Sequence, residues 1–333
     1  MIFDLIDALP KTELHLHIEG TLEPELMLNL AKKHQITLPY SNVQQIRDAY
    51  QFDNLQSFLD LYYIGADVLR DEDDFYQLMM AYFENCHKNN IVHTEIMFDP
   101  QTHTQRGIAF NIFMNGFKKA QSEALEKYNI SSYLILCFLR HLDEKSAINT
   151  LNQAKDYLHM IKAVGLDSAE LGNPPEKFKN VFLKAKDLGL ERVAHAGEEG
   201  PAQYIWNAIN KLDIARIDHG VRAVEDNELM TYLKDTQMPL TVCPLSNLKL
   251  KVFNSMAEHN IVSMLEAGLL VTVNSDDPSY FGGYLNDNFY ALTNELALTE
   301  THIIDLCINS FKASFLPDNT KDKWIDLITS KKF

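Results

Sequence analysis

Residues 13–18 read ELHLHI, a run in which apolar residues alternate with His15 and His17. A period of two indicates a β-strand, and it places both imidazoles on the same face. Seven further apolar runs of strand length follow along the chain, at 91–98, 132–139, 164–171, 191–196, 215–219, 239–244 and 269–275. The sequence therefore predicts eight strands.

Longer segments of helical character separate these runs, at 25–34, 57–69, 73–89, 110–128, 145–162, 175–188, 202–211, 225–235 and 256–267. Strands that alternate with helices indicate a parallel sheet, because parallel neighbours need long crossover connections. Eight strands buried on both faces favour an α/β fold of the (β/α)8 TIM barrel type over an open, doubly wound sheet. No linker-like composition divides the chain, so we expect one domain over residues 1–333.

The segment between the first two predicted strands, roughly residues 20–90, is too long for one crossover. We expect an inserted helical segment here. Its aromatic residues are Phe52, Phe58, Tyr62, Tyr63, Phe75 and Tyr76. Two interpretations stay open: these helices cap the mouth of the barrel, or they pack on its outer shell as amphipathic helices commonly do.

The chain is strongly acidic, with 30 Lys and Arg against 46 Asp and Glu and a formal net charge of −16 over 333 residues. Nucleic acids and anionic membranes attract basic clusters, so we expect neither as a partner. No apolar stretch approaches the roughly 18 residues of a membrane span, and the acidic N-terminal residues do not resemble a secretory signal. We therefore expect a cytoplasmic protein, while composition leaves its oligomeric state open.

The four cysteines are Cys86, Cys137, Cys243 and Cys307, and none forms a CxxC pair. In a chain of this length, such isolated cysteines are typical of reduced thiols, some of them buried as small apolar residues.

Imidazoles and carboxylates gather at the predicted carboxyl ends of strands, which form one rim in a barrel. His15 and His17 lie near the end of the first strand, and His195 lies near the end of the fifth, in HAGEEGP. Asp276 follows the last strand, in NSDDP. A His-x-His pair alone would suggest only a polar strand face. Three imidazoles and one carboxylate at three strand ends form a sufficient ligand set for zinc.

Three more polar residues lie near these ends. Glu198 follows His195 by three residues and, beside a metal, could hold and deliver a proton, although a solvated turn carboxylate is the simpler alternative. His219 could orient a metal-bound hydroxide or simply bond to Asp218. Asp277 could accept a hydrogen bond from a substrate or cap the following helix.

The stretches PKTELHLHIEGTLEPE (10–25), AHAGEEGP (194–201), IDHG (217–220) and TVNSDDP (272–278) together resemble the adenosine/adenine deaminase family of zinc hydrolases. The resemblance implies a (β/α)8 barrel with one catalytic zinc. The implied zinc ligands are His15, His17, His195 and Asp276. The implied proton donor is Glu198, the hydroxide-orienting residue is His219, and the purine contacts are Asp277 and, by a looser match in ELGN, the amide of Gly172.

Glu19 in the HLHIEG stretch, together with YIW (204–206) and NSDDPSYFGGY (274–284), resembles the adenine deaminase branch of the family. The adenosine-specific branch has Asp at the position of Glu19, where it meets the ribose. We expect the longer side chain to intrude on the ribose space and to favour a free base. The resemblance thus implies deamination of adenine to hypoxanthine in purine salvage, with adenosine or N6-substituted adenines as the alternative substrates.

Two rival functions stay open. A binuclear barrel hydrolase would commonly carry a carboxylated lysine at the end of the fourth strand, but SAELGN (168–173) contains no Lys, and Glu170 is the residue that could replace it. A zinc-binding scaffold without activity would have no need of Glu198 and His219 beside a complete ligand set. Metal content and ammonia release distinguish these rivals from the deaminase.

Overall fold

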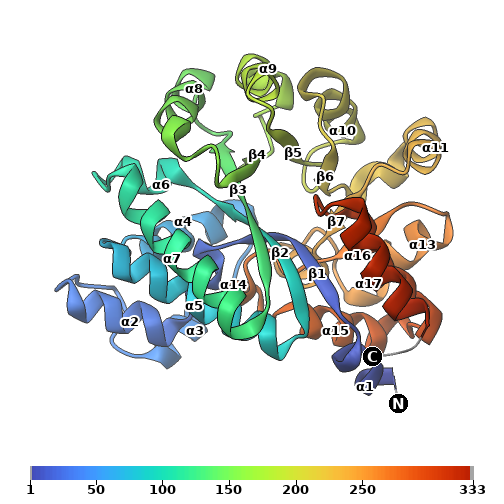
Figure 1. Cartoon of the computed structure of the whole chain (residues 1–333), viewed down its shortest axis with the longest axis horizontal. Helices are drawn as coiled ribbons and strands as arrows, with labels where there is room; N and C mark the ends of the chain where they lie inside the picture. The colour runs from blue at the N-terminus through green and yellow to red at the C-terminus, as the bar shows by residue number, and fades with distance from the viewer. Residues whose placement is uncertain (1, 331–333) are drawn as a thin grey trace.

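The computed structural model describes residues 2–330, in which eight parallel strands follow one another in chain order (Figure 1). They are β1 (Lys11–His17), β2 (Ile91–Phe98), β3 (Ser131–Leu139), β4 (Ile161–Asp167), β5 (Glu191–Ala196), β6 (Arg216–His219), β7 (Leu240–Val242) and β8 (Val271–Val273). Each strand pairs in parallel with the next. All seven residues of β1 are buried, as expected where helices cover a parallel sheet.

Helices surround the strands (Figure 1). They are α1 (Ile2–Ala8), α2 (Pro24–Lys33), α3 (Val43–Ala49), α4 (Leu55–Ala66), α5 (Glu72–Lys88), α6 (Pro100–Thr104), α7 (Phe110–Tyr128), α8 (Glu144–Gln153), α9 (Lys179–Asp187), α10 (Ala202–Asn207), α11 (Asn227–Thr236), α12 (Pro244–Lys249), α13 (Ile261–Glu266), α14 (Pro278–Phe281), α15 (Leu285–Leu296), α16 (Glu300–Ala313) and α17 (Asp318–Thr329). Short 3-10 or π turns are η1 (Glu19–Thr21), η2 (Ala154–Tyr157), η3 (Pro175–Phe178), η4 (Ala208–Leu212), η5 (Val221–Glu225) and η6 (Met256–Glu258).

The last strand returns to the first and closes the barrel. Just beyond β8, the backbone N–H of His17 donates to the carbonyl of Asp276 at 3.0 Å, and the N–H of Asp276 donates to the carbonyl of His15 at 3.1 Å. The side chain of Asn274 accepts from the N–H of Leu14 at 2.9 Å. Helix α16 packs against both β1 and β8. The predicted (β/α)8 barrel is confirmed, and its seam runs through three of the proposed metal ligands.

The predicted fourth strand, 164–171, is wrong at both ends, because β4 spans Ile161–Asp167. The predicted helix over 145–162 overlaps the first two residues of β4. In the structure, α8 ends at Gln153 and only a short turn follows. The strand stops where Ser168 adopts a left-handed backbone, with φ of 72°. The remaining residues of the predicted strand therefore belong to the loop above the barrel rim.

The inserted segment contains α2 to α5, and its aromatic residues divide between the two interpretations. Phe58, Tyr62 and Tyr63 on α4 line a cavity at the barrel mouth. Phe75 on α5 instead packs edge-on against Phe117 of α7, with ring centroids 5.8 Å apart. The cap interpretation holds for α4, and the outer-shell interpretation holds for α5.

All four cysteines are buried and free, as predicted. Over residues 2–330, none of the helices combines the length and apolar character needed to cross a bilayer.

Inside the barrel, a buried ion pair links three strands. The Arg216 guanidinium donates to the Glu95 carboxylate at 2.6 Å and to the Leu14 carbonyl at 3.0 Å, and it lies 4.6 Å from the ring centroid of Phe315. Burial alone would raise the pKa of Glu95, but Arg216, His93 and the backbone amide of Phe315 together outweigh it and lower the pKa. The pair thereby ties β6 to β1 directly beneath His15.

Replacing Arg216 with Met should lower the free energy of unfolding by about 3–5 kcal/mol, because Glu95 would be left as a buried charge without a cation. Lys186→Met removes an exposed ion pair with Asp213 and should cost less than about 1 kcal/mol. Urea denaturation followed by circular dichroism measures both variants. Equal losses would contradict the role given to Arg216.

Candidate active site

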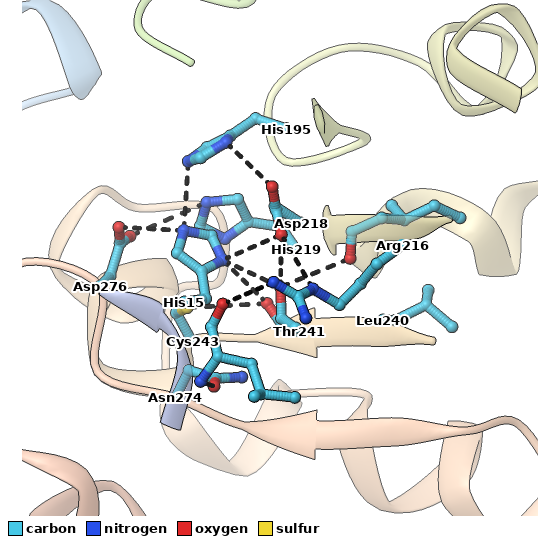
Figure 2. Close-up of polar contacts among 12 residues, drawn as sticks. His15, His195, Arg216, Asp218, His219, Leu240, Thr241, Cys243, Asn274 and Asp276 are labelled. Carbon is cyan, nitrogen blue, oxygen red and sulfur yellow. Dashed lines mark hydrogen bonds and ion pairs between the residues drawn. The ribbon is translucent and has the colours of Figure 1, made fainter. Parts of the chain in front are cut away.

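Three imidazoles and one carboxylate converge at the rim of the barrel. Nε2 of His195 lies 3.1 Å from Nε2 of His15 and 3.2 Å from Nε2 of His17. Oδ1 of Asp276 lies 3.3 Å from Nε2 of His15 and 3.5 Å from Nε2 of His17. Figure 2 shows His15, His195 and Asp276 facing one another. Atoms that ligate one cation from about 2 Å have separations of this size, so this set of donors fits a single metal ion.

The opposite nitrogens of two of these rings face acceptors. Nδ1 of His15 lies 3.2 Å from the carbonyl of Thr241, and Nδ1 of His195 lies 3.6 Å from Oδ2 of Asp218. The hydroxyl of Thr241 donates to Asp218 at 2.9 Å and holds that carboxylate in place (Figure 2). At His15, this acceptor on Nδ1 favours the tautomer whose Nε2 lone pair faces the metal position.

The charges also suit metal binding. Burial would raise the pKa of Asp276, but His15, His219 and His17 outweigh it and hold the pKa well below its usual range. Burial lowers the pKa of His195 well below its usual value, and that of His219 to about 3. At His15, by contrast, Asp276, Asp218 and the Thr241 carbonyl outweigh burial and raise the pKa, so this imidazole must release its proton when it binds a cation.

Two further carboxyl groups beside this cluster have raised pKa values, which favour the protonated form. Burial, followed by the charge of Asp276, raises the pKa of both Glu198 and Asp277 well above the usual value. Oε2 of Glu198 lies 3.5 Å from Nε2 of His219. Within residues 2–330, Oε1 of Glu198 and Oδ1 of Asp277 have no hydrogen-bond partner. Each is therefore free to bond to a molecule that enters the site.

The backbone is strained at the same rim. His219 and Asp276 both have φ of 62°, in the left-handed region that costs an ordinary residue about 1–2 kcal/mol. The Asp277 carboxyl also packs against Gly20, where a Cβ would lie 2.0 Å from Oδ1. Only glycine leaves room at that position. Such strain is typical of functional sites, where the surrounding fold enforces it.

A cavity lies above the cluster. Its apolar wall consists of Leu55, Phe58, Leu59, Leu139, Leu250 and Phe281. Its polar lining consists of His17, Tyr62, Tyr63, Asp99, Asp167, Ser168, His195, Glu198, His219, Asp276 and Asp277. An apolar slot that ends in a few convergent polar groups suits a flat heterocycle with polar edges.

Glu19 lies behind this cavity and does not line it. Its Oε1 accepts from Nε2 of His103 at 2.7 Å and from the N–H of Asp99 at 3.2 Å, and its Oε2 faces the hydroxyl of Tyr62 at 3.4 Å. Burial raises the pKa of Glu19 to about 7. Glu19 touches the cavity lining only through Tyr62 and Asp99, and its expected intrusion on the ribose space stays a prediction.

Gly172 lies outside the cavity lining as well. Its placement at the end of the fourth strand was wrong, since β4 ends at Asp167 and Gly172 is exposed on the following loop. A Cβ there would meet nothing within 4 Å. Ser168, which directly follows β4, lines the cavity instead.

Two cavity carboxyls, Asp99 and Asp167, were missed by the sequence reasoning. Asp99 directly follows β2, and Asp167 ends β4 with Oδ2 3.5 Å from Nδ1 of His17. Burial, followed by the charge of Asp99, raises the pKa of Asp167 well above its usual value. The strand-end rule that found the metal ligands applies to both residues. Because the predicted fourth strand ends at residue 171 and not at Asp167, the rule does not select Asp167.

Comparison with known proteins agrees with this site. The family model described as adenosine deaminase matches residues 10–331. An adenine deaminase of Acinetobacter baylyi is 58% identical over 325 residues, which are 98% of each chain. The solved structure of an adenine deaminase from Arthrobacter aurescens superposes with a TM-score of 0.95 at 46% identity, over 97% of this chain and 99% of that one. An amidohydrolase of Burkholderia ambifaria, solved with bound zinc, shares the fold at 22% identity with a TM-score of 0.91, over 99% of this chain and 92% of that one.

The fold and the site thus define a barrel hydrolase with a cluster of His and Asp side chains at its rim. The chain belongs to the adenosine deaminase family. Within that family it is similar along almost its whole length to adenine deaminases.

Purified protein should contain about one equivalent of a divalent cation, since one set of four donors converges on one point. His15→Ala should lower that content, because it removes a ligand atom. His93→Gln is the control. His93 lies two residues after the start of β2 and is as buried as His15, but its ring contacts Ser131. Elemental analysis checks all three proteins, and two equivalents in the native chain would contradict the single site.

Proposed function

We propose that this protein is a zinc-dependent adenine deaminase, which hydrolyses adenine to hypoxanthine and ammonia. The observation that carries the proposal is Glu198: a buried carboxyl with a raised pKa and a free oxygen, beside a metal-ligating cluster in a slot that suits a purine. The similarity to adenine deaminases supports the free base as substrate. We place the reaction in cytoplasmic purine salvage and assign it to one domain over residues 1–333.

His15, His17, His195 and Asp276 would hold the zinc ion. When bound, zinc lowers the pKa of a water ligand to about 7 and so supplies a nucleophile at neutral pH. Asp276 stays ionised for this role because the neighbouring imidazoles hold its pKa down. Without the imidazoles, burial would raise the pKa of Asp276 and neutralise its carboxylate.

Glu198 donates its proton to N1 of the purine, which withdraws electron density from C6 and prepares C6 for attack. His219 lies between the Glu198 carboxyl and Asp276, with Nε2 3.5 Å from the first and 3.8 Å from the second. From there, its neutral imidazole orients the attacking water. As the C–O bond forms at C6, one proton of the water passes to the amino group, the C–N bond breaks and ammonia leaves. The other water proton returns to Glu198 as the C6 carbonyl forms.

Asp277 lines the cavity, and its raised pKa favours the protonated form, so its carboxyl donates a hydrogen bond to N7 of the ring. Its contact with Gly20 fixes the direction of the side chain. Gly172 lies outside the cavity lining, and Glu19 acts on the substrate indirectly through Tyr62 and Asp99.

A binuclear site is not supported by the contacts of Glu170. Its two carboxylate oxygens accept hydrogen bonds from four backbone N–H groups of residues 197–200. A carboxylate saturated in this way has no oxygen left to bridge two metals.

The function is tested by ammonia release and the ultraviolet change from purified zinc-loaded protein with adenine, adenosine and N6-methyladenine. Adenine should have the highest kcat/KM. Preference for adenosine or for the N6-substituted base would move the protein to another branch of the family. Absence of ammonia from all three would favour the inactive scaffold.

Glu198→Gln should lower kcat by about 10²–10⁴-fold, because the amide keeps the size of the side chain but has no acidic proton. In the native enzyme, kcat should fall as the pH rises through the raised pKa of Glu198, since the deprotonated form cannot donate. Steady-state rates from pH 5 to 10, together with zinc content, check both points. A variant with a near-native rate would contradict the proton-donor role.

Glu19→Asp should lower the preference for adenine over adenosine by roughly tenfold, because a shorter side chain leaves space behind Tyr62 and one methylene is worth about 1–3 kcal/mol in a pocket. Glu199→Asp shortens a half-buried carboxyl outside the cavity lining and is the matched control. The ratio of kcat/KM for the two substrates is the measurement. An unchanged ratio in Glu19→Asp would remove Glu19 from substrate choice.

A further inference from the structure

The Glu170 carboxylate accepts hydrogen bonds from four consecutive backbone amides. Its Oε1 accepts from the N–H of Gly197 at 2.7 Å. Its Oε2 accepts from the N–H groups of Glu198 at 3.1 Å, Glu199 at 2.9 Å and Gly200 at 2.8 Å. Glu170 is 1% exposed. One buried side chain from the loop after β4 therefore fixes four consecutive residues of the loop after β5.

The shape of the second loop matches this arrangement. Gly200 approaches so closely that a Cβ would lie 2.6 Å from Oε1 of Glu170. Gly197 has φ of 73°, which turns successive N–H groups toward one point. Consecutive amides that converge in this way form a strong anion site, and each bond to a carboxylate is stronger than one between neutral groups.

Glu198 depends on its backbone for its position. Its Oε1 has no hydrogen-bond partner within residues 2–330, and its Oε2 faces His219 only at 3.5 Å. The backbone of Glu198 therefore sets the direction of the carboxyl that must reach the ring nitrogen. The backbone N–H of Glu198 donates to Glu170. Arg222 holds the same loop farther along, where it donates to the carbonyl of Glu199 at 2.6 Å.

We propose that Glu170 is a positioning residue for the reaction: its carboxylate holds residues 197–200 so that the Glu198 carboxyl points at the substrate. This inference rests on the proposed function, because it takes Glu198 as the proton donor. It assigns no substrate contact to Glu170. The HAGEEGP stretch and the SAELGN stretch thereby form one unit, although they lie on successive crossovers.

Glu170→Gln is the direct test. An amide side chain keeps the size but places an NH2 group against N–H donors, so either Gly197 or the other three amides lose their acceptor. We expect kcat for adenine to fall on the order of 10²-fold, the cost of a misplacement of about 1 Å, with KM and zinc content nearly unchanged. Glu191→Gln, which alters a carboxyl at the opposite end of β5, should stay near native.

A double-mutant cycle separates positioning from a general structural effect. In a Glu198→Gln background, Glu170→Gln should lower kcat by less than about twofold, because the group it positions is already lost. A drop of the same size in both backgrounds would overturn the proposal, and so would near-native activity of Glu170→Gln alone.

Gly200→Ala tests the same point and keeps the Glu170 carboxylate, because the added methyl displaces Oε1 of Glu170. This variant replaces Glu170→Gln if that protein does not fold. Its kcat should fall in the native background and not in Glu198→Gln. Native protein that releases no ammonia from adenine would overturn the proposed function as well. Active native protein with an unaffected Glu170→Gln variant would overturn only the role of Glu170.

Discussion

The site depends on the closure of the barrel between its last strand and its first. Backbone hydrogen bonds join His17 to Asp276 and Asp276 to His15. The side chains of the same three residues belong to the His and Asp cluster at the rim. In an open sheet, the first and last strands would lie at opposite edges, and these groups could not meet. Closure also places the other carboxyl ends on the same rim, which brings His195 from the fifth strand within 3.2 Å of both histidines.

Closure also concentrates charge, and burial decides which carboxyl group keeps it. Asp276, Asp277 and Glu198 are each about 4% exposed, and ionising all three would be costly. The imidazoles stabilise the charge of Asp276, and this charge in turn raises the pKa of its two neighbours. One group is therefore suited to bind a cation and the other two to donate protons, although all three are carboxylic acids of similar intrinsic strength.

Period-two patterns and strand ends were sufficient to predict the barrel and the cluster, because both follow from local alternation and from the common direction of parallel strands. The end of the fourth strand was not predictable in this way. It depends on the left-handed backbone of Ser168, and on a carboxylate at Glu170 that binds amides from the next loop. Neither feature changes the hydrophobic pattern. The same limit applies to α4 and α5, whose aromatic residues are equally buried in a cap and in an outer shell.

Glu19 shows why one motif position is a weak guide to substrate choice. The sequence indicates a carboxylate one methylene longer than aspartate, but the direction of that carboxylate is set by Tyr62, Asp99 and His103, which are 43, 80 and 84 residues away. Arg106 donates to Nδ1 of His103 at 2.8 Å, so the other ring nitrogen carries the proton that Glu19 accepts. The extra methylene lets Glu19 reach this partner. Its effect on the substrate must then pass through the cavity-lining side chains of Tyr62 and Asp99, which makes specificity a property of the network and not of the motif.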